Sequence, residues 1–152
     1  MSFLNKIKGA FNTSRDELTK QVSRYKNKKF MEGTVAVCAR IAVASDGVSA
    51  EEKQKMIGFI RASDELSVFE TEEVITFFNK LATSFDFDVE IGKGETMKYI
   101  LALKDQPEAA QLALRVGVAV AKSDGDFDSD EQHAVRDIAI ALGFDPEDYI
   151  KV

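Results

Sequence analysis

Two segments of the chain are apolar on almost every face of a helix, and they limit how the chain can fold. Thr34–Ala44 reads TVAVCARIAVA, and Ala109–Ala121 reads AAQLALRVGVAVA. A single arginine, Arg40 or Arg115, interrupts each segment. Helices of this kind belong at the centre of a bundle, where neighbouring helices cover all of their faces. We therefore expect both segments to lie inside, wrapped by amphipathic helices.

Capping boxes mark the starts of most helices. An oxygen-bearing residue stands three positions before a glutamate at Ser14, Ser49, Ser67, Asp105 and Asp128. Phe85–Ile91 alternates between apolar and acidic residues and is followed by two glycines, so it is predicted to be a connection. The sequence predicts an all-α, single bundle-like domain of seven or eight helices, near residues 15–28, 32–45, 50–62, 68–85, 95–104, 106–122, 129–142 and 146–151.

An internal repeat relates the two halves of the chain. Ala42–Gly47 reads AVASDG and Val120–Gly125 reads VAKSDG, so the Ser-Asp-Gly tripeptide recurs 78 residues later. In both copies a buried helix precedes the tripeptide and a capped amphipathic helix follows it. We therefore predict two helical repeats related by a pseudo-twofold axis.

Charge divides the chain into a basic arm and an acidic body. Residues 1–29 hold eight lysines and arginines against two acids, a net charge of +6, although the whole chain carries −6. Phe3, Leu4, Ile7 and Phe11 recur in this arm at roughly helical spacing. Three interpretations stay open: the amphipathic arm lies on an anionic membrane surface, it packs on the acidic body, or it is a disordered tail with a few apolar residues. Residues 30–152 form the acidic all-helical domain, which should repel nucleic acid.

The second Ser-Asp-Gly turn opens a dense acidic loop. Asp124, Asp126, Asp128, Asp130 and Glu131 lie within eight residues, and carboxylates so close repel one another unless a cation compensates them. Alternating oxygen ligands at 124, 126 and 128, with Glu131 from the next helix, suit Ca²⁺, with Mn²⁺ or Mg²⁺ as alternatives. The other interpretation is that Asp128 caps a helix, its acidic neighbours favour the helix dipole, and the rest is a solvated turn.

Neither acidic loop is an EF-hand. Counted from Asp124, Ser129 stands where that motif needs glycine and Val135 where it needs glutamate. The first loop offers Asp46, Ser49, Glu51 and Glu52, which taken alone favour capping over chelation. If the pseudo-twofold axis brings the two loops together, these acids could complete one shared site.

The remaining acidic groups and the classical reactive residues give no second site. Glu70, Glu72 and Glu73 are predicted in the first turn of a helix, and Asp86, Asp88 and Glu90 on the connection, all as surface charge. The single cysteine, Cys38, is predicted to be a small core residue, and the single histidine, His133, an exposed helical residue. No nucleophile signature or phosphate-binding loop is present, so we expect a protein that is not an enzyme. We also expect it to be a monomer.

The repeated Ser-Asp-Gly turns between Ala/Val-rich buried helices and capped acidic helices resemble the TerB family of tellurite-resistance proteins. The resemblance covers roughly residues 30–145 and makes residues 30–152 a TerB-like domain. It implies a cytoplasmic bacterial protein of tellurium resistance and stress response, which can be peripheral at the inner membrane. It also implies a membrane partner of the TerC type, other Ter proteins as partners, and divalent-metal binding at acidic positions. Mapped onto this chain, those positions are Asp46, Glu51, Glu52, Asp124, Asp126, Asp128 and Glu131. Val48 departs from the acidic pattern of the second loop and weakens the case for an independent first site.

Overall fold

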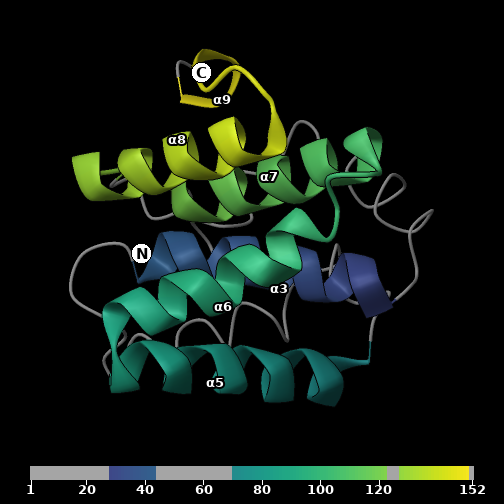
Figure 1. Ribbon diagram of the computed structural model, residues 1–152, viewed down its shortest axis with the longest axis vertical. Coiled ribbons are helices and arrows are strands. Elements are labelled where there is room, and N and C mark those ends of the chain that lie inside the picture. Colours follow the sequence, from purple (N-terminus) through teal and green to yellow (C-terminus); the bar gives the residue numbers. More distant parts are fainter. Residues whose placement is uncertain (1–27, 44–69, 123–126, 151–152) are drawn as a thin grey trace, which may run out of the picture.

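The computed structural model describes residues 28–43, 70–122 and 127–150, and within these residues all regular structure is helical (Figure 1). The predicted all-α fold is therefore confirmed for this part of the chain. The predicted helices near 15–28 and 50–62 and both Ser-Asp-Gly turns lie almost entirely outside the described residues. The predicted total of seven or eight helices and the pseudo-twofold axis thus stay predictions. The described helices are α3 (Lys28–Ala42), α5 (Thr71–Phe87), α6 (Val89–Leu101), α7 (Pro107–Lys122), α8 (Ser129–Leu142) and α9 (Glu147–Ile150).

Helix α3 is the centre of the bundle. It contacts α5, α6, α7 and α8, and every residue from Gly33 to Ile41 is buried. Figure 1 shows α3 in a middle layer beside α6, with α5 on one side, α7 and α8 on the other, and α9 beyond α8. The prediction that this segment is wrapped by other helices is confirmed. Its buried apolar area supplies a large part of the driving force for folding.

Helix α7, the second apolar segment, packs closely on α3 because one of its residues lacks a side chain. A Cβ atom built at Gly117 would clash with Cγ1 of Val37 and lie 3.2 Å from Cδ1 of Ile41. Most of α7 is buried, but Arg115 is exposed, so this arginine marks the solvent side of the helix. The expectation of a central helix is thus correct for α7 except along this edge.

The predicted connection over Phe85–Ile91 is wrong. Helix α5 continues to Phe87 and α6 begins at Val89, so Asp88 alone separates them. The Asp88 carboxylate accepts hydrogen bonds from the backbone amides of Glu90 at 2.8 Å and Ile91 at 3.2 Å. This cap starts α6 six residues earlier than the sequence predicts, and Gly92, which suggested a loop, instead packs against the ring of Phe85.

Helix α3 begins four residues and ends three residues earlier than predicted, whereas the remaining described helix ends follow their local chemistry more closely. Helix α8 has the predicted bounds; Asp128 caps its start, and Gly143 ends it with a left-handed φ of 86°. The short last helix begins at Glu147, whose amide donates to Oδ1 of Asp145 at 3.0 Å. Helix α5 begins three residues later than predicted, after Glu70, whose side chain makes no capping hydrogen bond.

The thiol of Cys38 lies in the core, as predicted. The residue is buried on α3, and burial raises the pKa of its thiol to about 12, well above the ordinary range. A thiol in these surroundings stays protonated and unreactive at neutral pH.

We expect the two glycines Gly117 and Gly94 to respond oppositely to alanine. Gly117→Ala should destabilise the protein by about 1–3 kcal/mol, because its methyl group overlaps Val37. Gly94→Ala is the matched control: its methyl group would meet nothing within 4 Å on α6, so it should stabilise by about 0.5–1 kcal/mol. Urea unfolding measures both free energies. A Gly117→Ala protein as stable as the parent would contradict the close packing of α3 on α7.

The raised pKa of Cys38 predicts a loss of stability in alkali. The unfolded chain ionises this thiol above about pH 9, whereas the folded protein keeps it protonated to about pH 12. Stability should therefore fall by roughly 1.4 kcal/mol per pH unit in this window because of Cys38. Comparing the unfolding free energies of the parent and Cys38→Ala across the window isolates this contribution. Parallel pH profiles for the two proteins would show that the thiol ionises freely in the folded state.

Candidate functional site at the acidic end of the bundle

Five helix termini lie at the same end of the bundle. Helices α3, α5 and α7 end there, and α6 and α8 begin there, on the left in Figure 1. Val43, just after α3, packs with Phe85 near the end of α5. We call this region the acidic end and define it by Val43, residues 86–91, Lys122 and residues 127–131. Residue 44 follows Val43 and residue 123 follows Lys122, so both Ser-Asp-Gly segments are attached to this end.

The start of α8 is held by a complete capping box. Oδ1 of Asp128 accepts from the amide of Glu131 at 2.8 Å, and Oε1 of Glu131 accepts from the amide of Asp128 at 3.1 Å. The side-chain amide of Gln132 donates to the carbonyl oxygen of Phe127 at 2.9 Å. The ammonium group of Lys122 lies 5.3 Å from the centre of the Phe127 ring. These contacts fix the last residues of the second acidic loop on the bundle.

Of the predicted metal ligands, the structure describes only Asp128 and Glu131, and it brings these two together. Asp46, Glu51, Glu52, Asp124 and Asp126 lie outside the described residues. Within residues 28–43, 70–122 and 127–150, no group of three or more Asp, Glu, His or Cys residues could hold a metal ion. A site with three or more such ligands would have to include residues outside this part of the chain.

The described part of the loop has the donor chemistry that a hard cation requires. Asp128 and Glu131 present carboxylate oxygens, which Ca²⁺, Mn²⁺ and Mg²⁺ prefer to nitrogen or sulfur. The Asp128 cap uses Oδ1, and a carboxylate can bind a cation through its other oxygen while one oxygen accepts an N–H bond. The capping box is thus compatible with a role of Asp128 as a ligand.

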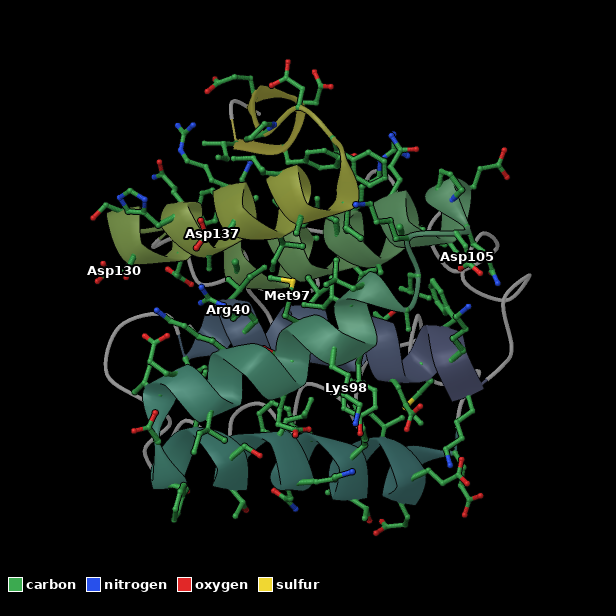
Figure 2. All side chains as sticks on the ribbon, in the orientation of Figure 1. Arg40, Met97, Lys98, Asp105, Asp130 and Asp137 are labelled. Atoms are coloured by element: carbon green, nitrogen blue, oxygen red, sulfur yellow. The ribbon has the colours of Figure 1, made fainter. Side chains whose placement is uncertain are left out.

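A buried arginine lies beside this end, although in the sequence it is only an interruption in an apolar helix. Arg40 is 5% exposed, and its Nη2 donates to Oδ2 of Asp137 on α8 at 3.3 Å (Figure 2). Burial lowers the pKa of Arg40, whereas the charges of Asp137 and Glu90 raise it. Among the described residues, Nε of Arg40 has no hydrogen-bond partner. The sequence contains one signal for this contact, the lone charge of Arg40 in an apolar helix. A buried cation is normally paired, so a carboxylate from another helix is expected beside it.

The single cysteine and the single histidine both lie on described helices. His133 is exposed on α8, as predicted, and Cys38 is buried on α3. Asp88 and Glu90, predicted as surface charge on a connection, belong instead to the start of α6 at the acidic end. Glu72 and Glu73 lie exposed in the first turn of α5, as predicted.

No helix among the described residues is both long enough and apolar enough to cross a membrane.

Comparisons with known proteins agree with the resemblance noted in the sequence. The family model described as "Tellurite resistance protein TerB" matches residues 31–152. A "Tellurium resistance protein TerB" from Alcaligenes sp is 81% identical over 118 residues, which are 78% of this chain and 97% of that protein. No solved structure matches the chain. With a family match over most of its length and a relative this similar, the chain belongs to the TerB family of tellurite-resistance proteins.

Proposed function

We propose that the protein contributes to tellurium resistance as a divalent-metal-binding interaction module. This proposal is supported mainly by the five helix termini that lie together at the acidic end. Both Ser-Asp-Gly segments are attached there, so Asp46, Glu51 and Glu52 are tethered to the end that holds Asp128 and Glu131. A cation bound between the segments, with Ca²⁺ the first candidate, would neutralise carboxylates that otherwise repel one another.

The partner we propose is a membrane protein of the TerC type, with other Ter proteins as further partners. The protein would bind this membrane partner from the cytoplasm, at the inner membrane. Cation binding would fix the angle between α7 and α8, because the second acidic loop connects these two helices. That angle decides which side chains of α8 a partner meets. The cation would thus control the interaction without any catalytic step.

The capping box favours a second candidate function. Asp128 and Glu131 satisfy each other's backbone amides without a cation, and capping alone accounts for these two residue types at this spacing. In this alternative the protein is a structural interaction domain, and its acidic end binds a basic partner by charge alone. Binding of such a partner would weaken steeply with salt and would not depend on chelators.

Calcium should raise the melting temperature of the native protein. At 100 times its Kd a ligand stabilises by about 2.7 kcal/mol, and each kcal/mol shifts a domain of this size by about 2–4 °C. Asp126→Asn should remove most of the shift. Asp145→Asn, which removes the same charge at the α9 cap, should retain it. Amide chemical shifts that move saturably at 124–131 and 46–52 would locate the ion in one shared site. Equal melting temperatures in millimolar calcium and in chelator would contradict cation binding and favour the alternative function, a structural interaction domain.

Substitutions at Asp128 separate its capping role from its proposed role as a ligand. Asparagine caps a helix about as well as aspartate, whereas alanine does not, so in chelator Asp128→Ala should cost about 1 kcal/mol and Asp128→Asn much less. Both variants should lose the stabilisation by calcium. An Asp128→Asn protein that keeps the whole calcium shift would show that Asp128 is a cap and no ligand.

A further inference from the structure

The α5–α6 corner, residues 86–91, exposes large apolar side chains at the acidic end. Phe87 is 80% exposed, Ile91 46% and Val89 41%. The other exposed large hydrophobics among the described residues are Leu101, at the opposite end of α6, and Ile140 on α8. Three large apolar side chains exposed within five residues of the chain are typical of a surface that another segment can cover.

Acidic residues alternate with these apolar side chains. Asp86, Asp88 and Glu90 are all exposed, and Lys93 is the basic neighbour, 3.6 Å from Oε1 of Glu90. The corner therefore carries net negative charge together with exposed apolar area. An anionic membrane would be repelled by these carboxylates, whereas a segment that is both apolar and basic would complement them.

The chain itself contains a segment of this kind. Residues 1–27 hold six lysines and arginines against two acids, a net charge of +4, and the apolar residues Phe3, Leu4, Ile7 and Phe11 lie among their lysines at roughly helical spacing. This segment precedes the family match, which begins at residue 31. Its charge and its apolar pattern are the complements of those at the α5–α6 corner.

The segment is long enough to reach the corner. Helix α3 begins at the opposite end of the bundle, where Nζ of Lys29 lies 3.1 Å from Oδ1 of Asp105 (Figure 2). The fifteen residues of α3 span about 22 Å between the two ends, at 1.5 Å per residue. Even as continuous helix, the 27 residues before α3 span about 40 Å, which is enough to return along the bundle.

We propose that residues 1–27 dock on the α5–α6 corner of their own chain, where their apolar side chains cover Phe87, Val89 and Ile91 and their basic side chains face Asp86, Asp88 and Glu90. The acidic end would then be occupied by the chain's own arm. This proposal does not depend on metal binding, because it concerns the corner and not the Ser-Asp-Gly segments.

A nitroxide label on the arm tests the proposal in the full-length protein. Ser2→Cys provides the attachment point, and Cys38 will not compete for the reagent because it is buried. Docking predicts that amide signals of residues 86–91 lose more than half their intensity, whereas those of 101–106, at the other end of α6, keep theirs. Molar salt should restore the signals by screening the charges. Unchanged intensities at 86–91 in low salt would overturn the proposal.

Two matched substitutions show whether the corner itself is the docking surface. Phe87→Ser should abolish the intensity loss, whereas Ile140→Ser, which removes an apolar side chain 65% exposed on α8, should leave it unchanged. Both side chains are exposed, and matching melting temperatures would show that both variants fold. Intensity loss that survives Phe87→Ser would contradict docking at this corner.

Two further samples test whether the arm binds a second copy of the chain or a membrane and not the corner of its own chain. Isotope-labelled protein without nitroxide, mixed with nitroxide-labelled protein without isotope, reports contacts between copies. Signal loss at 86–91 in this mixture would assign the surface to a second copy and overturn docking within one chain. Arm signals that change only on adding anionic phospholipid vesicles, with no intensity loss at 86–91, would assign the arm to a membrane and would likewise overturn it.

Discussion

The burial of α3 on all sides is the constraint on which the rest of the described structure depends. A helix with nine consecutive buried residues is stable only when neighbours cover its whole circumference, and among the described helices α5, α6, α7 and α8 all contact it. Once these four helices pack around α3, the positions of their ends are settled. The acidic end is therefore a result of core packing, and its carboxylates lie where the buried helices stop.

The fold of the described residues was predictable where the local signal and the burial pattern agree. The central position of α3 and the bounds of α8 follow directly from apolar periodicity and from Asp128, Glu131 and Gly143. The start of α6 was not predictable in this way, because Gly92 and Gly94 suggest a loop. The contact between Gly92 and Phe85 depends on tertiary packing, which the sequence does not reveal. Asp88 carried the missing signal, since an aspartate before a valine and a glutamate is a usual helix start.

The candidate site was predictable in its residue types and less so in its arrangement. The sequence predicts Asp128 and Glu131 as a pair, and the capping box places them together. It does not predict that α6 begins at the same end, because that depends on the single-residue corner between α5 and α6. Nor does it predict the contact between Arg40 and Asp137, which are 97 residues apart and meet only through packing of α3 on α8.

The Arg40–Asp137 contact has a consequence for communication within the molecule. It joins the helix that leads into the first Ser-Asp-Gly segment to the helix that follows the second. Separating the two groups would leave the buried guanidinium without its carboxylate and would destabilise the folded protein. Helices α3 and α8 therefore resist moving apart at this point. A displacement of α8 caused by binding at the second segment should therefore change the position of α3, from which the first segment continues. By thermodynamic reciprocity, the two segments would influence each other equally in both directions.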